Sequence, residues 1–209
     1  MASTRSTTLL AAPALALATL LLAGACGNST NENAVTTDGP ASEAATSADR
    51  ISLADDFTTG STRPVWEFPL SVDGWTLTVI DQDGVNQLSR AGGLFTSFQL
   101  DQGTQGGDDE GNSRAYLDTY YSAQQNSPGV ESVSAADPTT TTLPSDRGDL
   151  EFLSQEVQYT TTNGTTYHSR MLVRSLDTNV LVLQYAAPED EWSEAEWEKL
   201  TADVRVQLG

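Results

Sequence analysis

The sequence predicts an α+β fold, in which an antiparallel β-sheet with a C-terminal three-stranded meander is flanked by two main helices. Residues 66–100 and 150–186 contain stretches in which apolar and polar residues alternate, as in half-buried strands. Asp-Gly and Asn-Gly turn signals separate several of these stretches. Two other segments, 112–127 and 193–204, place their apolar residues at helical spacing instead.

Composition divides the chain into three parts. In residues 1–25 one positive charge, Arg5, precedes an apolar run from Leu9 to Ala25, which is typical of a secretory signal. Residues 26–62 are polar and sparse in apolar side chains, so we expect a flexible linker. Within it, Ala48–Phe57 could instead form a brief helix or dock as an extra edge. Residues 63–209 have the length of a single domain.

Cys26 is the only cysteine and directly follows the small residues Ala23, Gly24 and Ala25. This arrangement resembles the lipobox of bacterial lipoproteins, which implies a thiol that carries lipid and acyl chains such as palmitate. The alternative is an ordinary signal peptide that leaves a free thiol. A membrane-spanning helix is disfavoured, because the apolar run is near the short limit for a bilayer and contains Pro13. We therefore expect a lipid anchor at the extracytoplasmic face of the cell membrane.

The formal net charge of −19 limits the possible partners. Nucleic acids and anionic lipid surfaces both favour basic proteins, so neither is expected as a direct partner. Membrane attachment would then depend on the lipid at Cys26. A single cysteine also excludes an intrachain disulfide, so the fold must depend on its own core.

The first half of the domain is predicted to contain four strands and a helix. The strands cover 66–72, 75–79, 85–89 and 94–100, and Pro69 places the first at an edge of the sheet. Asp101–Asn112 is expected to be an exposed acidic loop. The helix begins at Asn112 or Ser113, either of which can cap it, and ends before Pro128. Residues 130–148 are expected to be mostly loop, with a possible short strand at Val130–Ser134.

The meander consists of Leu150–Thr161, Thr165–Ser175 and Asn179–Ala186. One apolar face is preserved only if the loop around Asn163-Gly164 has an odd length. We therefore predict a bulged loop with Gly164 in the left-handed conformation. The shared face would carry the residues Leu153, Val157, Tyr159, Tyr167, Met171 and Val173.

The second helix has a clear start. Ser193 and Glu196 have the spacing of a capping box, and Trp192 and Trp197 have that of a hydrophobic staple. Trp197, with Leu200 and Val204, is predicted to pack against the apolar strand Val180–Tyr185.

This order of elements resembles the PsbP-like fold and, among lipoproteins, the LpqN-like group of actinobacteria. The resemblance is carried by Trp66–Trp75, Tyr116–Tyr121 and Val180–Trp197. It is a pattern of spacing over most of residues 63–209. It implies an antiparallel sheet flanked by helices and a role in assembly or binding, and a catalytic centre is not implied.

Candidate chemical groups are few. His168 is the only histidine, and a site formed with Ser154 or Ser169 would lack the Gly-x-Ser-x-Gly elbow, so no catalytic residue is predicted. His168, Arg170 and Arg174 share one face of a strand, either as an anion-binding or partner-binding stripe or paired with Glu156 and Glu151.

No metal or cofactor is predicted. Asp81–Asn86, and Asp101 with Asp108–Glu110, could supply calcium ligands, but they lack the spacing of an EF-hand. A turn and a solvated loop are the simpler interpretations.

The sequence therefore favours a lipid-anchored, non-enzymatic module that binds a protein or another component of the cell envelope. The alternative is a carrier of a small or lipidic ligand, held between the sheet and the helix with Tyr116, Tyr120 and Tyr121. An envelope hydrolase is the third possibility.

Overall fold

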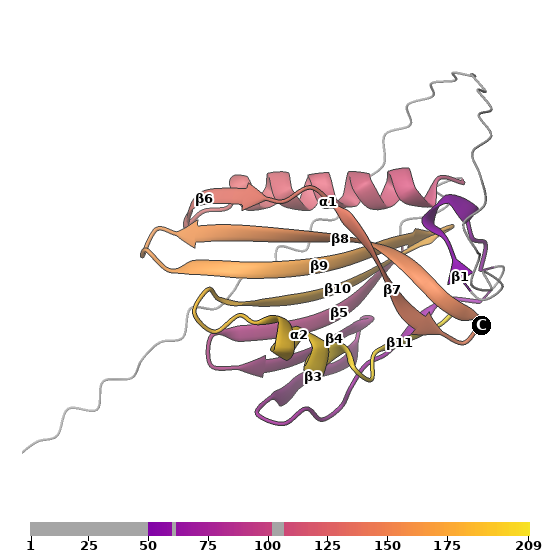
Figure 1. Cartoon of the computed structure of the whole chain (residues 1–209), viewed down its shortest axis with the longest axis horizontal. Coiled ribbons are helices and arrows are strands. Elements are labelled where there is room, and N and C mark those ends of the chain that lie inside the picture. The colour runs from indigo at the N-terminus through magenta and orange to yellow at the C-terminus, as the bar shows by residue number, and fades with distance from the viewer. Residues whose placement is uncertain (1–49, 60–61, 102–106) are drawn as a thin grey trace, which may run out of the picture. The chain divides into compact units, whose positions relative to one another are not determined.

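The computed structural model describes residues 50–59, 62–101 and 107–209; Cys26 and the signal segment lie outside them. The described strands form one sheet (Figure 1). Its order is β2 (Val65–Glu67), β11 (Arg205–Gln207), β7 (Thr139–Ser145), β8 (Gly148–Thr161), β9 (Thr166–Leu176), β10 (Asn179–Pro188), β5 (Gly93–Asp101), β4 (Val85–Arg90) and β3 (Thr76–Gln82). Two further strands, β1 (Arg50–Ile51) and β6 (Val130–Ala135), also pair with β8.

The sheet is mixed, so the prediction of an antiparallel sheet is confirmed only in part. β11 runs parallel to β7, and β1 runs parallel to β8. Strands β8, β9 and β10 are consecutive antiparallel neighbours, but they lie in the middle of the sheet. The chain then continues through helix α2 (Glu194–Thr201) and returns as β11.

One helix packs on each face of the sheet. Helix α1 (Asp109–Gln125) contributes Leu117 to a cluster with Met171, Val173 and Val182. Helix α2 contributes Trp197 and Leu200 to the larger cluster on the opposite face. Strand β10 is buried on both faces, as the continuous apolar run at 180–183 predicts.

The register of the β8–β9 hairpin follows the prediction. Leu153 lies opposite Val173, and Tyr159 lies opposite Tyr167, so the apolar residues share a face. The backbone N–H of Thr161 donates to the carbonyl of Thr165 at 2.9 Å, and Gly164 has a φ of +83°. The loop of odd length is the one that keeps this face apolar.

Helix α1 begins earlier than predicted. Asp108 is its N-cap and accepts a hydrogen bond from the Gly111 N–H at 2.8 Å, whereas the sequence pointed to Asn112 or Ser113. Of the acidic residues expected in a loop, Asp108, Asp109 and Glu110 instead occupy the helix start, where negative charge is stabilised by the helix dipole. Ser113 is buried inside the helix and accepts a hydrogen bond from the Ser175 N–H.

Strand β7 was not predicted, because the run Pro138–Pro144 looked like a low-complexity loop. The four consecutive threonines 139–142 show no alternation of polarity, but threonine is β-branched and fits a pleated strand. The short strand considered at Val130–Ser134 is present as β6. Conversely, the expected strand 66–72 is reduced to β2, which lies at an end of the sheet.

Residues 50–57 pack on the domain, and we call them the N-terminal strap. The strap contains β1 and the short helix η2 (Leu53–Asp55), and Leu53 is buried. Both possibilities for Ala48–Phe57, a brief helix and a docked extra edge, are found in its described part, and the folded region starts before residue 63.

Ser193 caps α2 as predicted, because its hydroxyl accepts a hydrogen bond from the Glu196 N–H at 3.2 Å. The prediction that the Glu196 side chain completes the capping box is wrong. The Glu196 carboxylate instead accepts a hydrogen bond from Trp75 Nε1 at 2.6 Å and pairs with Arg90. No helix in the described part of the chain is both long and apolar enough to cross a membrane.

Candidate functional site

The three cationic residues predicted to form one stripe on β9 belong to two separate sites. The ladder between β8 and β9 ends at the pair Leu153–Val173. His168 and Arg170 lie within the ladder, whereas Arg174 comes directly after it. Arg174 is therefore not paired with β8, whereas the other two residues are.

His168 and Arg170 belong to a polar site beside α2. A groove of about 310 Å³ lies there, between strands β7 to β9 and the ring of Trp197. Its lining consists of Ala136, Asp137, Thr139, Thr140, Thr141, Ser154, Glu156, Arg170, Leu172 and Trp197. We call it the α2 groove.

Arg170 is held on several sides. Its Nη2 donates to Glu156 Oε1 at 2.5 Å, and its two Nη atoms donate to the two carboxylate oxygens of Glu194 at 2.7 Å each. The guanidinium also lies over the rings of Trp192 and Trp197, at 5.2 and 5.3 Å from their centroids. These contacts fix the position of the charged group.

His168 shares the same carboxylate. Its Nε2 lies 3.1 Å from Glu156 Oε2, and its ring stacks on Trp192 with the centroids 3.9 Å apart. Partial burial alone would raise the pKa of Glu156, but the hydrogen bonds and positive charge of Arg170 outweigh it, and the pKa is lowered. The pairing of His168 and Arg170 with Glu156 was one of the two interpretations of the sequence.

The hydroxyls considered for catalysis are not assembled with His168. Ser154 lies opposite Leu172, four positions along β9 from His168, which corresponds to about 13 Å in a strand. Ser169 is on the other face of β9, where its hydroxyl accepts a hydrogen bond from Gln184 Nε2 at 2.9 Å.

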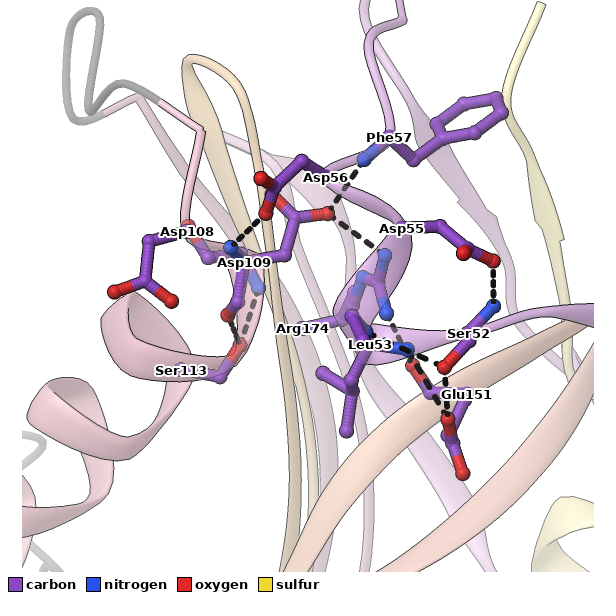
Figure 2. Close-up of polar contacts among 12 residues, drawn as sticks. Ser52, Leu53, Asp55, Asp56, Phe57, Asp108, Asp109, Ser113, Glu151 and Arg174 are labelled. Atoms are coloured by element: carbon purple, nitrogen blue, oxygen red, sulfur yellow. Dashed lines mark hydrogen bonds and ion pairs between the residues drawn. The ribbon is translucent and has the colours of Figure 1, made fainter. Parts of the chain in front are cut away.

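Arg174 forms a buried cluster with residues from three other segments (Figure 2). Its Nη2 donates to Asp109 Oδ2 at 2.7 Å, and its Nη1 donates to the Glu151 carbonyl at 3.2 Å. The side chains of Arg174 and Asp109 are 0% and 2% exposed. Asp109 also accepts a hydrogen bond from the Phe57 N–H at 3.0 Å. Burial raises the pKa of Asp109, against the opposing effect of Arg174.

The same cluster holds the N-terminal strap. The Glu151 carboxylate forms an ion pair with Arg50 and accepts hydrogen bonds from the Ser52 hydroxyl at 3.1 Å and the Leu53 N–H at 3.0 Å. Burial alone would raise the pKa of Glu151, but these hydrogen bonds, first that of Leu53, lower it. The Asp56 carboxylate accepts a hydrogen bond from the Asp109 N–H at 3.1 Å. The expected ion pair of Arg174 with the Glu151 carboxylate is thus replaced by one with Asp109.

The acidic segments considered for calcium have other contacts. Asp81–Asn86 span the end of β3, the Asp83-Gly84 turn and the start of β4, and the Asn86 side chain accepts a hydrogen bond from the Asp81 N–H. Asp108 caps α1, and Asp109 pairs with Arg174. The described residues include no group of three or more His, Cys, Asp or Glu residues that could hold a metal ion.

The tyrosine-bearing helix packs directly on the sheet. Tyr116 and Tyr120 lie against the cluster around Leu117, and the Tyr120 hydroxyl accepts a hydrogen bond from Gln184 Nε2 at 2.7 Å. Burial raises the pKa of both tyrosines. Packed side chains therefore occupy the interface that the carrier hypothesis would use.

No protein-family profile matches the sequence, and no curated protein matches it. Among solved structures, the chain is similar to LpqN, which is involved in cell envelope biogenesis of Mycobacterium tuberculosis; the identity is 14% and the TM-score 0.45, over 70% of this chain and 86% of LpqN. It is also similar to the cyanobacterial PsbP of Synechocystis, with 12% identity and a TM-score of 0.43, over 66% of this chain and 85% of that protein. These are the two groups that the sequence resembles. The likenesses concern the arrangement of the chain.

Proposed function

We propose that this protein is a non-catalytic binding module of the cell envelope, anchored through lipid on Cys26 at the extracytoplasmic face of the membrane. Its ligand is a protein or another envelope component. The observation that carries the proposal is the α2 groove, where Arg170 is already fixed by two carboxylates and two tryptophan rings. Groups that are ordered before binding lose little conformational entropy when a ligand arrives.

Two other observations favour binding over the alternatives. The groups required for a serine hydrolase lie apart, because the register separates Ser154 from His168. A carrier would need room between α1 and the sheet, but Leu117 and Tyr120 pack there against β9 and β10.

The anchoring part of the proposal depends on the sequence around Cys26. Replacing the thiol with a hydroxyl, Cys26→Ser, removes the only group that can be alkylated with diacylglycerol. We expect this variant to leave the detergent phase in a phase-partitioning experiment, whereas the parent protein enters it. A processed variant that still enters the detergent phase would contradict the anchor.

The binding part is tested by site-specific photo-crosslinking in intact cells. A photoreactive residue at Thr141, in the groove, should crosslink to a discrete envelope component. Thr78 is the matched control, because it is also an exposed threonine on a strand but lies on β3, at the opposite end of the sheet. Identical crosslinking patterns from both positions, or none from Thr141, would contradict a binding role for the groove.

A further inference from the structure

Strand β7 has an outer edge that is largely unpaired in the described part of the chain. On that side it is joined to β11 only at the pair Ser145–Val206. Residues 139–142 precede this contact, and all four are exposed threonines. Their pairing with β8 on the inner side is regular, without a register shift. A regularly paired, uncharged edge of this kind is a ready template for another strand.

Other edge strands of the described sheet are short, irregular or covered, and β1 has only two residues. Strand β3 has two register shifts in its pairing with β4, and such irregularities hinder the addition of another strand. Strand β2 has only three residues. Strand β6 is packed against α1. The open part of β7 therefore differs from the rest of the sheet perimeter.

The direction of the backbone groups on β7 can be assigned. The Asp146 N–H donates to the Val206 carbonyl at 3.1 Å, so the backbone N–H of residue 146 points toward the outer side of β7. Backbone groups alternate between the two sides of a strand, so Pro144, Thr142 and Thr140 share this direction. Pro144 has no N–H to present there, whereas Thr140 and Thr142 each present an N–H and a carbonyl at the open edge.

The α2 groove lies next to this edge. Thr139 and Thr141 line it, and a strand added beside β7 would lie about 5 Å away with alternate side chains on the same face. Three carboxylates, of Asp137, Glu156 and Glu194, lie at or beside the groove around the single guanidinium of Arg170. The local excess of negative charge favours a cationic side chain.

We propose that the open edge of β7 binds an extended segment of a partner protein as an additional strand, with a lysine or arginine of that segment entering the α2 groove. The proposal rests on the binding function proposed above and specifies its partner. A second copy of this chain is a poorer occupant, because each copy carries a net charge of −19 and the two would repel each other.

The first experiment selects displayed random peptides of twelve residues on the purified full-length protein. We expect the selected peptides to be rich in β-branched residues and to contain one lysine or arginine at a fixed position. Replacing that residue with glutamate should weaken binding at least tenfold. Selected peptides with an acidic residue at the fixed position, or the absence of any enriched sequence, would overturn the proposal.

The second experiment tests the backbone edge with Thr142→Pro and its matched control Thr142→Val. Proline removes the outward N–H, as Pro144 does two residues later, while valine keeps the N–H and the β-branched shape. We expect Thr142→Pro to weaken peptide binding at least tenfold and Thr142→Val to leave it within about twofold. Urea unfolding of both variants establishes that the domain remains folded. Equal binding by the parent and Thr142→Pro overturns the edge proposal.

The outcomes separate this proposal from the binding function itself. If Thr142→Pro has no effect but crosslinking from Thr141 persists, the groove binds a component without strand addition. If sedimentation shows a dimer that Thr142→Pro dissociates, the edge belongs to a second copy. If removal of residues 27–49 releases a blocked peptide site, the edge belongs to the chain's own segment. Each of these results overturns the proposed partner.

Discussion

Arg170 and Arg174 lie four residues apart on β9 and form ion pairs of similar length in very different surroundings. The carboxylate partners of Arg170 are 39% and 55% exposed, whereas Asp109, the partner of Arg174, is almost completely enclosed. Water screens the first set of charges and is excluded from the second. The Arg170 site can therefore exchange partners with a ligand, while the Arg174 site fixes the position of the strap and of α1.

The largest effect is expected from Arg174→Met. The variant leaves the Asp109 carboxylate buried without its cationic partner, and breaking a buried pair in this way costs about 3–5 kcal/mol. Urea unfolding followed by tryptophan fluorescence measures the loss. The matched control, Arg170→Met, should cost about 1 kcal/mol, because its partners remain in contact with water. Equal losses for the two variants would contradict the distinction between the sites.

A smaller effect is expected from Leu53→Ala in the strap. Leu53 is 3% exposed and packs in the cluster under α1, so truncation should cost about 2–3 kcal/mol in the free energy of unfolding. Ala54→Ser changes the neighbouring exposed residue and should cost less than about 0.5 kcal/mol. If Leu53→Ala lowers the free energy of unfolding no more than this control does, the strap adds no stability to the fold.

The smallest effect is expected from Glu156→Gln, and it should depend on pH. In the folded state the pKa of Glu156 is lowered from its ordinary value of 4.5. The contribution of its charge to the free energy of unfolding is therefore complete above pH 4.5, and it is lost as the pH falls through the pKa of the folded state. Because the side chain is 39% exposed, the contribution should be below about 1 kcal/mol. Unfolding curves of parent and variant between pH 7 and about pH 3 should therefore converge at the acidic end.

Comparing the parent with Asp109→Asn should show a pH dependence of stability opposite in sign to that of Glu156→Gln. The pKa of Asp109 is raised above 3.8, so the folded state binds this proton more tightly than the unfolded state does. The stability of the parent relative to Asp109→Asn should increase as the pH falls through the folded pKa. Parallel pH profiles for Glu156→Gln and Asp109→Asn would show that the two sites do not differ in the way described.

The sequence predicted the elements that local periodicity determines. In the β8–β9 hairpin, a one-residue slip would expose Leu153 and Tyr159, so the apolar pattern alone selects the register and the conformation of Gly164. The run 180–183 likewise identified a strand covered on both faces. The pairing of Arg170 with Glu156 followed from the same cross-strand argument.

The remaining features depend on contacts between distant parts of the chain. Strand β7 has no alternating pattern, and it is ordered by its pairing with β8. Arg174 shares the strand parity of Arg170, but the end of the β8–β9 ladder is not encoded in that parity. Its partner Asp109 is 65 residues away in sequence. The position of Trp192 and Trp197 over Arg170 depends on where α2 docks, which helical spacing does not determine.

Under the proposed anchoring through Cys26, the docked strap would limit how far the domain can stand from the membrane. With lipid on Cys26 as proposed, residues 27–49 would lie between the anchor and Arg50, the first residue of the described domain. Fully stretched, this length of chain spans at most about 80 Å, compared with about 120 Å for a linker that ends at residue 62. Under that proposal the β7 edge would reach only a layer of restricted depth above the bilayer, and a partner fixed farther out in the envelope would be beyond its range.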